Sequence, residues 1–233
     1  MLFRSHGTFS LTFAHYRTTS SDNRTNKIDT MMRNTAIKHG IIAKDWQWIT
    51  DLMILKRSGL FIIDKMRCIQ LMEPEFNMIN KLLGKRVMAH AERFNLLSHN
   101  QYGSRKRHKS INCCLNKVCL MDILWQKHRA GAISMNDLKG CYNRIIHTVA
   151  ILVLMAFGVD HTAASMLMET LQLAEHSIKM GFGVSEPLYG NRAPVPEQGL
   201  GQGNGNAPAI WCLISCIMIK VMEKRGHSVE LMS

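Results

Sequence analysis

A chain of 233 residues, 46% of them hydrophobic and 20% charged, is long enough to bury a core and too apolar to be disordered throughout. Its 29 Lys and Arg outnumber 17 Asp and Glu, and the resulting net charge of +12 favours polyanionic partners, nucleic acid ahead of a membrane surface. The 7 cysteines are an odd number and form no Cys-x-x-Cys pair, which argues against a secreted disulfide scaffold and against a structural zinc site.

The first 44 residues are polar and rich in Ser, Thr, Asn and Arg, which predicts a disordered or poorly ordered N-terminal arm. No acidic residue precedes Asp22, as in organellar transit peptides; an unstructured or wrongly chosen start of the reading frame is the alternative. The cysteine pattern favours a reducing, intracellular location, nuclear or cytoplasmic. The most apolar stretch, 145–159, is shorter than the roughly 20 residues that span a membrane, so it predicts a core helix and no membrane partner.

Apolar spacing and turn residues predict a mixed, helix-rich α+β unit without repeats. In the first half the predicted elements are a short helix from Asp45, strands over 60–63 and 66–71, a helix from Pro74 to about 94, a basic loop over 100–109 and a helix capped by Ser110. In the second half they are a strand over 131–136, helices over about 145–157 and 162–179, a loop or hairpin over 181–206, a helix from about 207 to Gly226, and the start of a strand over 229–232.

The segment 136–147 places the carboxylate of Asp137 at the end of a predicted strand and the ring of Tyr142 shortly after it. A phosphoryl-transfer site needs hard oxygen ligands for Mg²⁺ on a rigid element, and a carboxylate at a strand end provides one. Taken alone, a single aspartate of this kind is more typical of a surface or capping position.

The run 198–211 reads Gln-Gly-Leu-Gly-Gln-Gly-Asn-Gly-Asn-Ala-Pro-Ala-Ile-Trp, a glycine-dense loop that leads into a helix started by Pro208. Such a loop lets the backbone lie close to a planar or phosphorylated ligand. It does not meet the dinucleotide pattern G-x-G-x-x-G, because Asn204 and Asn206 stand where the third glycine is needed. A plain flexible loop is the alternative.

Together with two upstream segments, these motifs resemble, in order, those of a reverse transcriptase (RNA-directed DNA polymerase) of the non-LTR retrotransposon type. Residues 136–147 are similar to D-[IL]-x-K-A-F-D-x-[IV]-x-H, although Asn143 replaces the second aspartate, and residues 202–211 are similar to Q-G-x-x-x-x-P-x-[LI]-[FW]. Residues 65–81 and 101–110 resemble the fingers segments L-R-x-I-x-L-x-x-x-x-x-K and Q-x-G-F-R-x-x-x-S, with Ser104 in place of an aromatic. A solvated basic loop is the alternative for 105–109.

The resemblance implies a right-hand polymerase, with fingers over 45–130 and a palm over 131–233. It implies that Asp137 is the catalytic, metal-binding aspartate, that the Leu138 carbonyl is a second Mg²⁺ ligand, and that Tyr142 selects against the 2′-hydroxyl of the nucleotide. Gln202 and Gly203 would contact the templating base and the nascent pair. Arg67 and Arg105 would face the triphosphate and the template, a role that suits the guanidinium. The implied partners are an RNA template, a DNA primer and deoxynucleoside triphosphates.

One part of the family pattern is missing. The third motif, x-Asp-Asp, does not occur, since the sequence has no Asp-Asp pair and no aspartate after Asp160. Two-metal catalysis needs acidic ligands on both sides of the ion pair. We therefore expect a partial right-hand polymerase, fingers plus incomplete palm, truncated before this motif and unable to extend a primer. A non-catalytic, basic nucleic-acid-binding remnant of a retroelement is the alternative.

Overall fold

The computed structural model describes residues 22–56, 59, 62–131, 133, 138, 140–186, 189–190 and 198–227. Its helices are α2 (Asn23–His39), α3 (Pro74–Arg93), α4 (Ser110–Gln126), α5 (His147–Ala156), α6 (His161–Gln172) and α7 (Ala207–Lys224). Its strands are β1 (Trp48–Leu55), β2 (Met66–Met72), β3 (Glu175–Met180), β4 (Gly183–Val184) and β5 (Tyr189–Gly190). Short 3-10 helices cover Lys44–Gln47 (η1), Ile63–Lys65 (η2) and Cys141–Arg144 (η3). The structure confirms a mixed helix and sheet fold.

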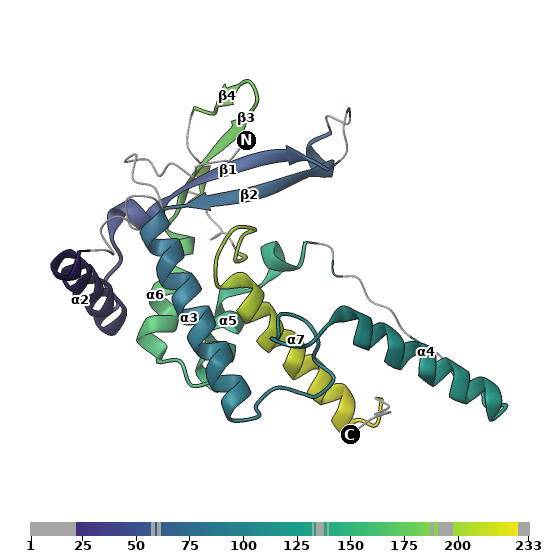
Figure 1. The fold of residues 1–233 in the computed structure, drawn as a ribbon. Helices are drawn as coiled ribbons and strands as arrows, with labels where there is room; N and C mark the ends of the chain where they lie inside the picture. The colour runs from purple at the N-terminus through teal and green to yellow at the C-terminus, as the bar shows by residue number, and fades with distance from the viewer. Residues whose placement is uncertain are drawn as a thin grey trace.

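The strands form one sheet in the order β2-β1-β3-β4, with β5 paired to β3. β1 runs antiparallel to β2, with Ile49 opposite Met72, and parallel to β3, with Trp48 opposite Glu175. Parallel neighbours need a crossover connection. Here that connection contains α3, α4, α5 and α6, so residues distant in the sequence meet beneath the sheet (Figure 1).

The core lies among α3, α5, α6 and α7, which gather on one side of the strands (Figure 1). Each of these helices turns an apolar stripe inward. Side chains with no exposed surface include Phe76 of α3, Leu154 of α5, Leu167 of α6 and Ile210 of α7. Leu200, in the loop before α7, is equally buried, so this loop is anchored in the core.

The described part of the N-terminal segment, 22–44, differs from the poorly ordered arm expected over 1–44. Asp22 caps α2 by accepting hydrogen bonds from the backbone N–H groups of Arg24 and Thr25, and Gly40 ends the helix in the left-handed conformation. α2 packs against α6 and buries Ala36. The polar composition misled the prediction because a helix held by its two caps and one small buried face needs few apolar residues. Residues 1–21 lie outside the described residues.

Two predicted helices are wrong in part. The apolar residues after Asp45 form η1 and then β1, and the helix expected over 162–179 ends at Gln172, with β3 beginning at Glu175. β1 and β3 pair with each other, so tertiary pairing overrides the helical spacing of the apolar residues. In contrast, β2, the helix from Pro74 and the last helix with its stop at Gly226 are confirmed.

Other predicted elements lie largely outside the described residues. Of the strand expected over 131–136, the structure describes only residues 131 and 133, and these two have no regular structure. The strand start expected over 229–232 lies outside the described residues. Ser110 is the first residue of α4 and not its cap, because Lys109 takes the cap position and no side chain bonds the helix end there.

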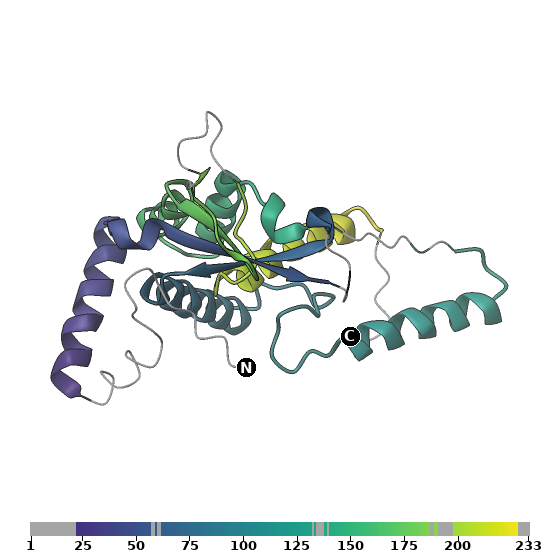
Figure 2. The ribbon, with the colours of Figure 1, turned by 90° about the horizontal axis from the view of Figure 1, so that it is seen from above.

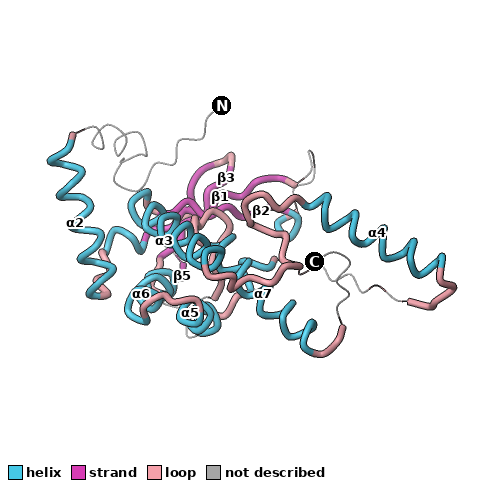
Figure 3. Tube along the Cα trace, turned by 60° about the horizontal axis from the view of Figure 1, so that its bottom comes forward, coloured by secondary structure: helices cyan, strands magenta, loops and turns pink. Residues whose placement is uncertain are grey.

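Seen from above, α2 and α4 lie at opposite ends of the molecule, with the sheet and the other helices between them (Figure 2). None of the residues of α4 is buried, and the tilted view shows the helix extending away from the rest (Figure 3). Among the described residues, no helix is both long and apolar enough to cross a membrane.

Candidate functional site

The glycine loop, residues 198–206, lies against β2 on one side. The backbone N–H of Gln70 donates to the carbonyl of Gln202, with 2.6 Å between nitrogen and oxygen. Gly203 has φ +125°, and a Cβ there would collide with the Gln70 carbonyl. Only glycine combines this backbone conformation with so close an approach. The hydrogen bond and the close approach of Gly203 therefore fix the position of the loop on β2.

On its other side the glycine loop is bonded to the segment that follows residue 140. Leu200 N–H donates to the carbonyl of Tyr142 at 2.7 Å, and Gly199 N–H donates to the carbonyl of Ile145 at 2.9 Å. The side-chain oxygen of Gln198 accepts from the His147 N–H at 2.8 Å. These three bonds make the loop and the segment around Tyr142 one structural unit.

The side chain of His147 also bonds to the glycine loop. Its Nε2 lies 2.6 Å from the Gly199 carbonyl, and because a carbonyl only accepts, Nε2 carries the proton. Burial lowers the pKa of His147, and this favours the neutral ring, while the Gly199 hydrogen bond acts in the opposite direction. The buried Nδ1 makes no hydrogen bond within the part of the chain that the structure describes. His147 is thus a buried anchor of the loop.

The third support comes from α3. The Asn77 side-chain amide donates to the Gly203 carbonyl at 3.0 Å, and its oxygen accepts from the Gly205 N–H at 2.7 Å. Gly205 is packed so closely on α3 that an added Cβ would lie 2.8 Å from the Cβ of Lys81. The close approach of the loop to α3 therefore requires glycine at position 205.

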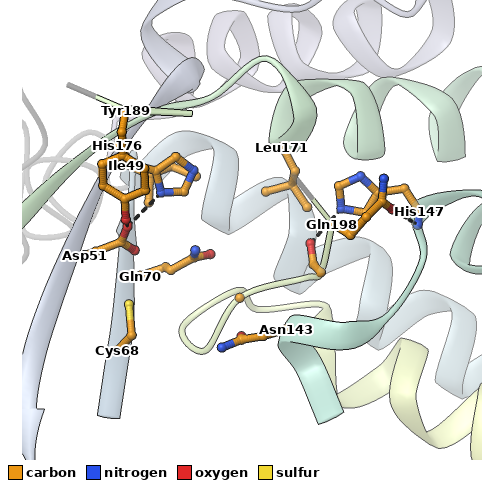
Figure 4. A pocket seen from close by; sticks show the side chains of 12 residues that line it. Ile49, Asp51, Cys68, Gln70, Asn143, His147, Leu171, His176, Tyr189 and Gln198 are labelled. Carbon is orange, nitrogen blue, oxygen red and sulfur yellow. Dashed lines mark hydrogen bonds and ion pairs between the residues drawn. The ribbon is translucent and has the colours of Figure 1, made fainter. Parts of the chain in front are cut away.

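A polar cavity of about 210 Å³ lies beside the start of the glycine loop and is lined by residues of both the loop and the sheet (Figure 4). Asp51, His176 and Tyr189 gather at one side of this cavity, and His147 with Gln198 at the other (Figure 4). The remaining lining residues are Ile49, Cys68, Gln70, Asn143, Leu171, Gly199 and Gly201.

Asp51 accepts hydrogen bonds on Oδ2 from His176 Nδ1, at 2.8 Å, and from the Tyr189 hydroxyl. Burial acts to raise the pKa of Asp51, but the bonds from His176 and Tyr189 and the charge of His176 outweigh it and hold this pKa below its usual value. The carboxylate is therefore ionised at neutral pH and already engaged.

A sequence model of the family described as reverse transcriptase (RNA-dependent DNA polymerase) matches residues 54–229, which is more than half of the chain. The chain belongs to the reverse transcriptase family. No curated protein matches it. The match runs from the end of β1 past α7, so it includes the glycine loop, the segment around Tyr142 and all the predicted site residues.

In this reverse transcriptase chain, the Leu200–Tyr142 bond attaches the segment of Tyr142 to the loop that carries Gln202 and Gly203. Tyr142 is half-buried and packs against the core, and burial raises the pKa of its phenol, which stays neutral. Gln202 and Gly203 are exposed at the loop surface. The predicted contacts of these three residues with a nucleotide stay predictions; the Leu200–Tyr142 and Gln70–Gln202 bonds attach the loop to the segment of Tyr142 and to β2.

The two predicted arginines lie elsewhere. Arg67 is exposed on β2, and alternation along the strand puts it on the opposite face from Cys68 and Gln70, which line the cavity. Arg105 donates to both carboxylate oxygens of Glu92 at 2.8 Å, and to the carbonyls of Ser98 and Gln101. In this conformation Arg105 ties the loop after α3 to that helix, and its role toward the triphosphate or the template stays a prediction.

The family implies Mg²⁺, which prefers several oxygen ligands in near-octahedral geometry. Among the residues that the structure describes, no three His, Cys, Asp or Glu side chains gather into such a group. Asp51 is already bonded to His176 and Tyr189, and the Leu138 side chain is exposed. The described residues alone therefore supply no such ligand group, and the predicted Mg²⁺ site stays a prediction because Asp137, its catalytic ligand, lies outside them.

Sequence reasoning included Gln70, Asn77, His147 and Gln198 in its motifs but did not assign to them the role of holding the glycine loop. Their partners are up to 128 residues away in the chain, as for Asn77 and Gly205. The one signal available was the unusual density of glycine at 199, 201, 203 and 205, since each such residue marks a place where backbone approaches closely.

Proposed function

We propose that the glycine loop and the segment around Tyr142 bind a nucleotide opposite a template base, as part of a fingers and palm arrangement of the non-LTR retrotransposon type. The observation that supports this proposal is the pair of backbone bonds that attach the glycine loop to two other segments, from the Leu200 N–H to the Tyr142 carbonyl and from the Gln70 N–H to the Gln202 carbonyl. The exposed Gln202-Gly203 peptide offers a hydrogen-bonding edge, and the half-buried ring of Tyr142 lies in the segment to which the same loop is bonded. A nucleoside presents the matching groups.

The partners follow from this site and from the charge of the chain. An excess of 12 positive charges favours a polyphosphate strand, because each neutralised phosphate releases condensed counterions. We propose an RNA template with a DNA primer, and deoxynucleoside triphosphates as the nucleotides. Tyr142 supports the last point, since an aromatic ring beside the sugar excludes the 2′-hydroxyl that distinguishes RNA from DNA.

We further propose that these 233 residues bind nucleotide and nucleic acid without extending a primer. Nucleotidyl transfer with two Mg²⁺ ions needs carboxylates on both sides of the ions, and the sequence offers Asp137 without any Asp-Asp pair. A second candidate function is a basic nucleic-acid-binding remnant that no longer recognises nucleotides. The net charge of +12 supports both candidates equally.

The test uses the full chain with a fluorescent DNA primer annealed to an RNA template. We expect binding whose affinity falls linearly with salt on a logarithmic scale, slower dissociation when the complementary deoxynucleotide is added with Mg²⁺, and no extension with Mg²⁺ or Mn²⁺. Binding that is insensitive to the complementary nucleotide favours the remnant. Primer extension that is abolished by Asp137→Ala overturns the proposal that the catalytic site is incomplete. A chain that binds no nucleic acid overturns both candidate functions.

A further inference from the structure

Asn77 bonds the glycine loop with both ends of its side-chain amide. Its NH₂ group donates to the carbonyl of Gly203 at 3.0 Å, and its oxygen accepts from the N–H of Gly205 at 2.7 Å. The two bonds straddle Asn204, whose side chain accepts from the Asn206 N–H. A single residue of α3 thus fixes the part of the loop that follows directly on Gln202.

The chemistry of this contact is specific to asparagine. It needs one donor and one acceptor on the same short side chain, which aspartate lacks as an ionised acceptor and alanine lacks altogether. The loop is adapted to the same contact, because a Cβ at Gly205 would come within 3.0 Å of the Asn77 oxygen. The close approach of α3 and the loop therefore depends on both residues.

A loop with four glycines in seven residues, 199–205, has many conformations of similar energy, and ordering it is costly in entropy. Leu200 anchors its beginning in the core and α7 fixes its end. Between them, the exposed Gln202-Gly203 peptide is held by the Gln70 N–H on one side and by Asn77 on the other. Without Asn77, one of these two supports is removed and the peptide gains freedom where the nucleotide is proposed to bind.

We propose that Asn77 is a positioning residue that holds the Gln202-Gly203 peptide in its nucleotide-binding conformation. The proposal rests on the proposed function for the binding step, and on the two hydrogen bonds alone for the holding step. Asn77 acts through the loop and does not itself contact the nucleotide. It is expected to affect nucleotide recognition while leaving general nucleic-acid binding unchanged.

The holding step is tested by deuterium exchange of the full chain without ligand, comparing Asn77→Ala and Asn77→Asp with the wild type. We expect amide exchange in the peptide that covers 198–211 to rise about tenfold in Asn77→Ala and less in Asn77→Asp, which keeps an acceptor for the Gly205 N–H. Asn112→Ala, an exposed asparagine of α4, is the matched control and should change nothing there. Unchanged exchange in Asn77→Ala overturns the proposal, whatever the wild type does with nucleotides.

The binding step is tested with the primer–template complex. We expect the dissociation constant of the complementary deoxynucleotide to rise about tenfold in Asn77→Ala and less in Asn77→Asp, while the salt-dependent affinity for the primer–template stays within about twofold of the wild type in both. An equal loss of both affinities, or no loss of nucleotide affinity despite faster exchange, overturns the positioning role. If the wild type itself ignores the complementary nucleotide, the proposed function fails, and with it the nucleotide-binding part of this proposal, whereas the exchange experiment still decides whether Asn77 holds the loop. Should Asn77→Ala not fold, Asn77→Asp supplies both measurements.

Discussion

Arg105 illustrates how one side chain organises a basic loop. Its guanidinium reaches both oxygens of Glu92 in α3 and two backbone carbonyls, so four hydrogen bonds converge on a side chain that is 10% exposed. The hydrogen bond from Arg105 lowers the pKa of Glu92. The fork of the guanidinium makes this possible, because an ammonium group cannot bond both oxygens in one plane.

We therefore predict that Arg105→Lys lowers the free energy of unfolding by about 1–2 kcal/mol, since the charge remains but the bidentate bonds and carbonyl contacts do not. Urea denaturation followed by circular dichroism measures the change. Arg107→Lys, at an exposed position of the same loop, is the control and should lie within about 0.5 kcal/mol of the wild type. Unchanged stability together with weaker deoxynucleotide binding would instead support the phosphate-facing role that the family resemblance implies.

At the residue scale, the sequence indicates the exposed members of the site better than its supports. Tyr142 and Gln202 stand at positions set by motif spacing, and the structure bonds the segment of Tyr142 to the glycine loop through Leu200. Gln70, Asn77 and His147 fall within the motifs, but the motifs do not show that they support the glycine loop, because the partner of each is distant in the sequence. The motif predicts a functional role for Arg105, which stays a prediction, and gives no sign of its ion pair, since Glu92 belongs to the preceding helix.

Among the elements, the crossing of α3 and α7 is the contact on which the glycine loop depends. Gly84 of α3 faces the first residues of α7, where an added Cβ would lie 2.8 Å from the side-chain oxygen of Asn206 and 3.4 Å from the Cβ of Ala209. Small residues at this crossing allow the two helices to approach closely. The end of the loop is held at the start of α7, so the spacing of the helices also sets the position of the loop.

We predict that Gly84→Val destabilises the protein by about 1–3 kcal/mol, because the branched side chain forces α3 away from α7 in a packed core. Lys85→Val, one residue along and exposed, is the matched control and should cost only the helix propensity of valine, roughly 0.5 kcal/mol. Thermal unfolding of the three proteins measures the difference. Equal effects of the two substitutions would mean that the crossing tolerates the extra volume.

Elements with strong local boundaries were predictable, and elements defined by distant pairing were not. α3 and α7 begin at or next to a proline, and the chain after α7 turns at Gly226, which has φ +71°. β1 and β3, in contrast, become strands because they pair in parallel across more than 100 residues, and their apolar spacing by itself favours helix. The pairing of two segments so far apart in the chain cannot be predicted from the residue spacing within either segment.

At the scale of the whole molecule, Asp51, His176 and Tyr189 join three strands that the chain order separates. Asp51 lies in the central strand β1, His176 in β3 and Tyr189 in β5, and the ion pair between Asp51 and His176 is almost fully buried. This cluster also lines one side of the cavity beside the glycine loop. A change in the register of the sheet would therefore also change the lining of that cavity. A register slip of one residue would move Asp51 to the other face of β1.

The pKa of Asp51 is depressed in the folded protein, which determines how the cluster responds to pH. A carboxylate with a depressed folded pKa stabilises the protein above its unfolded pKa, about 3.9 for aspartate, and that stabilisation is lost as the pH falls through the folded value. Asp51→Asn removes the negative charge that accepts the hydrogen bonds from His176 and Tyr189. The variant should therefore be less stable than the wild type at pH 7, by about 2 kcal/mol, and the difference should shrink below about pH 4. Urea denaturation of both proteins between pH 3 and pH 7 measures it, with Asp122→Asn, exposed on α4, as a control that should follow the wild type at each pH. A difference that stays constant down to pH 3 would show that the charge of Asp51 does not contribute to joining the strands.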